Sequence, residues 1–157
     1  MKNDIYPIII IAIFFSSCAI NYPALPEEEL TTSQKLAFIY KTDQKDRRRV
    51  LFKLLTTRYD KAIKYLKIIK VSDRDSLRLS EVITMFNHGL VITDQDKFYA
   101  ASVYEHGGGL KMYPDSAYFQ IAYNFFKELY DKGYKKGLTK SLMTTSYENW
   151  QYELKQK

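Results

Sequence analysis

The chain has 157 residues, 46% hydrophobic and 15% aromatic, which suits one folded domain with a real core and excludes a disordered chain. Its formal net charge is +6, from 24 lysines and arginines against 18 aspartates and glutamates. The basic residues are spread over several segments, and the densest run, Arg47 to Arg49, has Asp43 and Asp46 beside it. Nucleic-acid-binding domains more often concentrate basic residues on one face, so the composition argues against a nucleic-acid partner.

The amino-terminal segment has the pattern of a leader. A lysine precedes an apolar run from Ile5 to Phe15, and two serines then precede Cys18, the only cysteine in the sequence. At about eleven residues the run is too short to span a bilayer, which takes about 20, but it has the length of a signal-peptide core. The small pair before Cys18 resembles a lipobox, the recognition sequence of bacterial lipoproteins, although Phe15 stands where leucine is usual.

The lipobox resemblance implies a signal peptide over residues 1–17, cleavage before Cys18 and acylation of that cysteine with chains such as palmitate. An ordinary secretory signal with a chance cysteine is the alternative. Ala19 stands where aspartate is associated with inner-membrane retention, so the analogy favours the outer membrane. Residues 18–31 contain two prolines and three consecutive glutamates and are typical of an extended tether. We therefore expect a domain over residues 32–157, held at the cell envelope and facing the periplasm.

Apolar residues recur with a helical period through this domain. A first helix is predicted to begin at a cap near Thr32 or Ser33 and to carry an apolar stripe as far as Leu55, and a short second helix covers residues 60–69. A third is expected to begin at Ser72, with Asp75 three residues later, and to end at Gly89.

The second half of the domain continues in the same way. A fourth helix is predicted from Thr93, with Asp96 three residues later, to a stop at the three glycines 107–109. A fifth begins after Asp115 and ends at Gly133, and a sixth covers roughly residues 138–154. No segment alternates convincingly with a period of two. The predicted fold is all-α, a single-domain bundle of about five to six helices.

His106 and the three glycines after it resemble an oxyanion-hole or phosphate-binding loop only superficially. The hydrolase loop follows a strand and requires a G-x-S-x-G elbow with a later histidine, and the sequence has neither. The phosphate-loop spacing is also missing, and two histidines eighteen residues apart do not suggest a metal site. We expect the glycines to form a helix end and a connection, with His106 as the last helical residue, and we expect no cofactor.

Charged residues interrupt the apolar stripe of the first helix. Where the stripe should continue after Tyr40, the sequence has Asp43, Asp46 and Arg47. Buried charges must be paired, so either the helix breaks there, or the charges are exposed, or a polar cluster is built into the core or a cleft. We favour the cluster. If the first, third and fourth helices meet, it would also include three later residues, Asp75, Arg78 and His106.

Three segments resemble a family of small bacterial helical proteins of unknown function. These are D-Q-K-D-R at residues 43–47, D-S-L-R-L from residue 75 and Y-A-A-S-V-Y-E-H-G from residue 99, similar to D-Q-x-x-R, D-S-x-R-L and Y-x-A-A-x-x-x-Q-H-G in that order. The resemblance covers about residues 36–155 and implies the fold and the polar cluster, but no activity. The chain departs from the family in three places: Glu105 replaces glutamine, Tyr147-Glu148-Asn149 stands near the position of an Asp-Arg pair, and the closing G-T-Q tail is missing.

Two functional hypotheses follow. The first is a lipid-anchored interaction or binding module, without enzymatic activity, that binds an unknown envelope protein or small ligand and contacts the membrane through Cys18. The alternative is a ligand-binding or enzymatic domain in which His106 acts as a base, acidic residues orient it and Arg78 contacts an anion. A structural envelope component or the immunity partner of a toxin is a third possibility that no residue selects.

Overall fold

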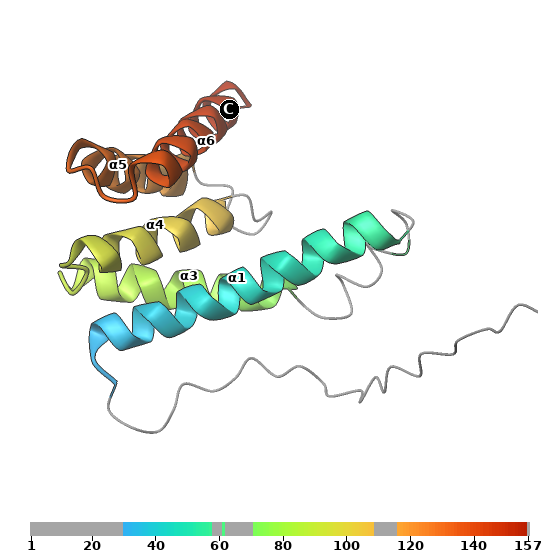
Figure 1. Cartoon of the computed structure of the whole chain (residues 1–157), viewed down its shortest axis with the longest axis horizontal. Helices are drawn as coiled ribbons and strands as arrows, with labels where there is room; N and C mark the ends of the chain where they lie inside the picture. Colours follow the sequence, from blue (N-terminus) through green and yellow to red (C-terminus); the bar gives the residue numbers. More distant parts are fainter. Residues whose placement is uncertain (1–29, 58–60, 62–70, 109–115, 157) are drawn as a thin grey trace, which may run out of the picture.

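The computed structural model describes residues 30–57, 61, 71–108 and 116–156, and over these ranges the chain is an all-α bundle without strands. Its helices are α1 (Thr32–Thr56), α3 (Val71–Asn87), α4 (Asp94–Gly108), α5 (Ser116–Asp131) and α6 (Lys136–Lys155), shown in Figure 1. The predicted fold class is thereby confirmed. The leader, Cys18, the tether up to residue 29, the cap at Asp115 and all but residue 61 of the helix predicted over residues 60–69 lie outside the described residues.

The central element is α4. It packs against α1 and α3 on one side and against α5 on the other, and α6 packs on α5 (Figure 1). A helix with neighbours on several sides must be buried nearly all round, and α4 is buried at every position from Ala100 to Glu105. Phe98 anchors the layer by edge contacts with Tyr40 of α1 and Phe126 of α5, at centroid distances of 5.8 and 6.1 Å.

Several predicted helix ends are confirmed. The amide of Thr93 donates to Asp96 Oδ2 and the amide of Asp96 donates to Thr93 Oγ1, both at 3.1 Å, so the pair caps α4 reciprocally. Gly89 and Gly133, which follow α3 and α5, have φ values of 67° and 76°, in the left-handed region that glycine adopts without strain.

Three predicted boundaries were wrong. The cap of α1 is Thr31, whose side chain accepts from the amide of Gln34, because glutamine at that position can return the bond to the Thr31 amide. Ser72 lies inside α3 and does not begin it. The helix α4 does not end at His106 but includes Gly107 and Gly108.

Gly107 is a packing residue of the α3–α4 contact. A Cβ atom placed on it would lie 2.7 Å from Cδ2 of Leu79, a side chain that is itself buried. Glycine therefore lets α4 approach α3 more closely than any other residue would. The sequence predicted only that this glycine ends a helix; its role in the packing of α4 against α3 was not predicted.

The carboxyl-terminal part of α1 projects beyond the ends of α3 and α4 (Figure 1). The apolar stripe predicted to be buried there is instead exposed at Leu51, Leu54 and Leu55, by 58, 40 and 77%. Leu77 of α3 is also exposed, by 54%. Within the ranges given above, no helix is long and apolar enough to cross a membrane.

Candidate functional site

A cluster of charged side chains lies where α1, α3 and α4 meet. The helix α1 continues unbroken through residues 43–47, so Asp43 and Asp46 remain on the face that Leu36 and Ile39 occupy, each two turns earlier. Their exposed fractions are only 1 and 3%. Two aspartates thus replace apolar residues in the core, where each needs a partner.

Arginines from α1 and α3 supply these partners. Arg78, which is 1% exposed, donates to Asp75 Oδ1 at 2.8 Å and to Asp46 Oδ2. One Nη atom of Arg47 lies 2.6 Å from Asp75 and 3.3 Å from Asp43. The two guanidinium groups therefore bridge all three aspartates and tie α1 to α3.

A third arginine, Arg74, completes the network. Its Nε and one Nη donate to the two carboxylate oxygens of Asp46, both at 2.9 Å, and Arg74 is 5% exposed. This bidentate geometry is the strongest form of an arginine–carboxylate pair. Arg74 was not among the residues predicted for the cluster, although its position one helical turn before Arg78 places both on one face of α3.

The cluster is close to electrical balance, with three aspartates against Arg47, Arg74 and Arg78. Burial acts to raise the pKa of Asp43, but the hydrogen bond from His106 and the neighbouring positive charges outweigh it and lower that pKa. Burial is likewise outweighed at Asp46, whose pKa is lowered by hydrogen bonds from Arg74 and Arg78. Asp75 behaves differently, because burial and the charge of Asp43 prevail over Arg47 and raise its pKa.

His106 joins the cluster from α4. Its Nδ1 lies 2.7 Å from Asp43 Oδ2. Because the pKa of Asp43 is lowered, the carboxylate is ionised and accepts, so we assign the donated proton to Nδ1. The side chain of His106 is 28% exposed. All six residues named from the sequence, Asp43, Asp46, Arg47, Asp75, Arg78 and His106, therefore meet in one connected network.

A small hollow of about 220 Å³ lies beside His106, between α1, α4 and α6. It is lined by Tyr40, Gln44, Phe98, Ser102, Glu105, His106, Leu138 and Leu142. Glu105 is nearly buried there, and its carboxylate accepts from Ser146 Oγ and, at 2.7 Å, from Asn149 Nδ2. The glutamate that departs from the family motif is thus satisfied by α6.

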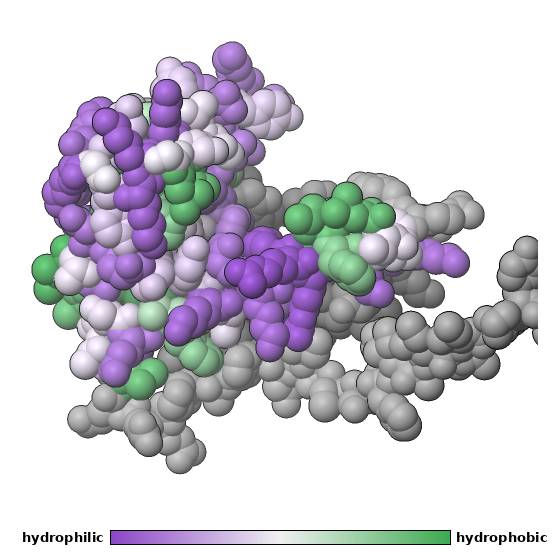
Figure 2. Space-filling view, in the orientation of Figure 1, coloured by the Kyte–Doolittle hydropathy of each residue, from purple (hydrophilic) through white to green (hydrophobic). Residues whose placement is uncertain are grey.

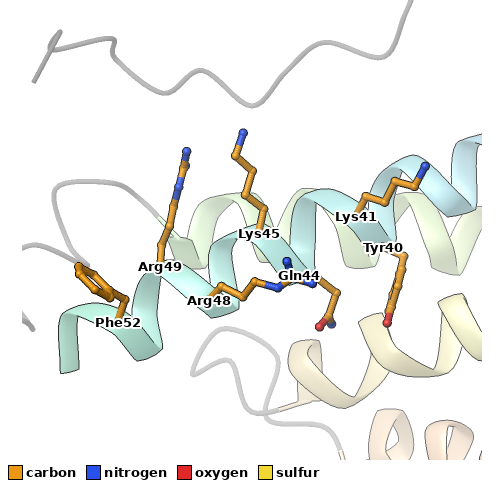
Figure 3. A pocket seen from close by; sticks show the side chains of 7 residues that line it. All are labelled: Tyr40, Lys41, Gln44, Lys45, Arg48, Arg49 and Phe52. Carbon is orange, nitrogen blue, oxygen red and sulfur yellow. The ribbon is translucent and has the colours of Figure 1, made fainter. Parts of the chain in front are cut away.

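A second, larger groove of about 580 Å³ runs along the outer face of α1. Figure 3 shows its lining residues: Tyr40, Lys41, Gln44, Lys45, Arg48, Arg49 and Phe52. Lys41, Lys45 and Arg49 follow one another at intervals of four residues and point to the same side of the helix (Figure 3). We call Lys41, Lys45, Arg48 and Arg49 the cationic row.

Few carboxylates of the described residues lie close enough to neutralise the cationic row. Of its four members only Arg49 approaches a carboxylate in the part of the chain that the structure describes, at 3.9 Å from Asp46. Like charges four residues apart on a helix repel one another and cost a few tenths of a kcal/mol. The sequence predicted only a dispersed charge excess, whereas the spacing of four between Lys41, Lys45 and Arg49 was the signal that these residues share one face.

Neither hollow has the features of a metal centre. Across residues 30–57, 71–108 and 116–156, no three side chains of the ligating types histidine, cysteine, aspartate and glutamate are grouped so that they could hold a metal ion. The carboxylates of the polar cluster are occupied by arginines and a histidine instead.

Comparisons with protein-family models, with curated proteins and with solved structures find no match to this chain. The resemblance carried by the three short motifs therefore stays a prediction.

Proposed function

We propose that the protein is a lipid-anchored binding module of a bacterial cell envelope, and that the groove along α1 is its binding surface for an anionic partner. The cationic row is the observation that carries this proposal. Three cations of the row, Lys41, Lys45 and Arg48, are exposed, and no ion pair to a described carboxylate joins them to the fold. A groove of this size flanked by Tyr40 and Phe52 offers both charge and aromatic contact to a ligand.

The anchoring part of the proposal rests on the leader and on Cys18. Its test is the mass of the amino-terminal peptide together with fractionation of cells expressing the natural chain or Cys18→Ser. We expect acylated Cys18 at the amino terminus and a membrane-bound natural chain, with Cys18→Ser released from the membrane fraction. An intact, unmodified amino terminus on protein recovered from the cytosol contradicts this part.

The binding part is tested by charge reversal. Lys41→Glu with Lys45→Glu reverses the charge of the amino-terminal half of the cationic row, and Lys140→Glu with Lys155→Glu makes the same change in net charge at exposed sites on α6. We expect the first pair, and not the second, to abolish capture of acidic components from solubilised envelopes. Equal loss with both pairs means that overall charge, and not the groove, controls binding.

A second candidate function is a small-ligand site at the hollow beside His106. It is favoured by the Asp43–His106 contact, because a histidine that donates from Nδ1 to a carboxylate presents an oriented Nε2 acceptor. His106→Asn keeps a donor near the position of Nδ1 and removes Nε2. We expect small polar ligands found by NMR screening to bind the natural chain and Lys41→Glu but not His106→Asn. Ligands that bind all three proteins equally exclude this site.

We also infer a relationship to the family of small helical proteins that the motifs resemble. It is supported by the way the three segments combine: the first supplies Asp43 and Arg47, the second Asp75 and Arg78, and the third His106. Residues that are far apart in sequence thus contribute to one network. The relationship predicts a polar cluster of the same composition in family members.

A further inference from the structure

We propose that the groove of α1 docks onto a phosphate-bearing lipid surface, so that the helix lies along the membrane to which the protein is anchored. This inference rests on the proposed function and names the partner of the same groove. It follows from three features of α1: the length of the cationic row, the apolar side chains at the carboxyl-terminal end of the helix, and the position of that end relative to the bundle.

The cationic row fits an extended anionic surface better than a single small anion. Lys41 and Arg49 are separated by two helical turns, or about 12 Å along the axis at 1.5 Å per residue. Side chains distributed over that length can contact several lipid headgroups at once, and each basic residue near an anionic bilayer adds to binding. A single phosphate, in contrast, would leave most of the row without a counter-charge.

Apolar side chains adjoin the row. Leu51, Phe52 and Leu55 are exposed by 58, 64 and 77%. Figure 2 shows this apolar patch at the carboxyl-terminal end of α1, directly beside the hydrophilic middle of the helix. A solvated polyanion such as a nucleic acid gains little from exposed leucines, whereas a bilayer accepts cations at its headgroups and apolar side chains just below them. The combination therefore favours a membrane over a soluble polyanion.

The geometry of the chain permits this contact. The outer end of α1 projects past α3 and α4, so the bundle does not block its approach to a flat surface (Figure 1). The proposed lipid at Cys18 precedes Thr31 by about 13 residues, a length of chain that can span at most about 45 Å. A helix of 25 residues is about 37 Å long, so the tether is long enough for α1 to lie on the bilayer.

The test uses the full chain carrying Cys18→Ser, which has no acyl group, so that its outcome does not depend on lipidation. Binding to phosphatidylglycerol vesicles is compared with binding to phosphatidylcholine vesicles by flotation, at low and at high salt. The leader is the same in every variant and contributes equally. We expect a preference for phosphatidylglycerol that weakens as salt increases, because exposed charges are screened.

Two variants and one control locate the contact. We expect Lys41→Glu with Lys45→Glu to reduce the phosphatidylglycerol preference by at least about tenfold, and Lys140→Glu with Lys155→Glu to leave most of it. Phe52→Ser should weaken binding at high salt by about fivefold, because the apolar contribution is not screened. Circular dichroism verifies that each variant is folded.

Three results overturn the proposal. The first is the absence of any preference for phosphatidylglycerol. The second is an equal loss of that preference with both lysine pairs. The third is binding to heparin that depends on Lys41 and Lys45 without binding to vesicles, which would assign the groove to a soluble polyanion. Unmodified Cys18 would refute the anchor but leave these vesicle measurements unchanged, so the two failures are distinguishable.

Discussion

The two faces of α1 carry charge in opposite ways. On the inner face Asp43, Asp46 and Arg47 are matched by residues of α3 and α4, and the group is close to neutral. On the outer face Lys41, Lys45 and Arg48 of the cationic row are exposed, and among the described residues the row approaches one carboxylate, Asp46, at 3.9 Å from Arg49. Buried charge must be neutralised within the fold, whereas exposed charge need not be. The inner face therefore stabilises the bundle, and the outer face is available to a partner.

The largest expected effect comes from breaking the inner network at Asp46. Asp46→Asn leaves Arg74 and Arg78 without the carboxylate that both contact, so we expect the free energy of unfolding to fall by about 3–5 kcal/mol. Denaturant unfolding measures this change. Asp73→Asn, at an exposed position of α3, is the control and should change stability by less than about 0.5 kcal/mol. Equal effects at the two positions would mean that the buried, paired carboxylate matters no more to the fold than an exposed one.

The next effect concerns the close approach of α4 to α3. Gly107→Ala forces a methyl group against Leu79, and overpacking of this kind costs about 1–3 kcal/mol, partly offset by the better helix propensity of alanine. Gly137→Ala, where a Cβ meets no atom within 4 Å, should instead stabilise the protein by up to about 1 kcal/mol. Thermal unfolding of the two variants should shift in opposite directions. A stabilising Gly107→Ala would show that the α3–α4 contact is loose.

A smaller effect appears in the pH dependence of stability. The pKa of Asp43 and of Asp46 is lowered in the folded state, so their contribution is present above their unfolded pKa, near 3.9, and is lost as the pH falls through the folded values. In Asp43→Asn the free energy of unfolding should therefore fall less steeply as the pH is lowered. The raised pKa of Asp75 acts with the opposite sign, so in Asp75→Asn the free energy of unfolding should fall more steeply as the pH is lowered. Identical pH profiles for the two variants would contradict these directions.

The smallest effect belongs to the outer face. Lys45→Gln relieves repulsion with Lys41 and Arg49, each four residues away, so we expect stability to be unchanged or to rise by about 0.2–0.5 kcal/mol. Chemical denaturation at low salt measures the difference, which should shrink as salt is added. A clear loss of stability would mean that Lys45 supports the fold.

The sequence predicted the all-α class and the inner cluster because both depend on local patterns. Thr93 with Asp96 and the two left-handed glycines act within one helical turn, and Asp43, Asp46 and Arg47 are conspicuous where apolar residues belong. The partner Arg74 and the close packing of Gly107 depend on how α3 and α4 approach each other, which periodicity does not specify. The exposure of Leu51 and Leu55 was missed for a related reason: an apolar stripe shows which face is apolar but not how far the bundle extends along it.

The unbroken course of α1 from Thr32 to Thr56 has a mechanical consequence. A continuous helix resists twisting about its own axis, so its inner and outer faces cannot turn independently. A partner bound to the outer face of α1 consequently fixes the orientation of Asp43, whose carboxylate is hydrogen-bonded to the imidazole ring of His106. The ring resonances of that histidine, observed by NMR, would then report occupancy of a surface that the imidazole itself does not touch.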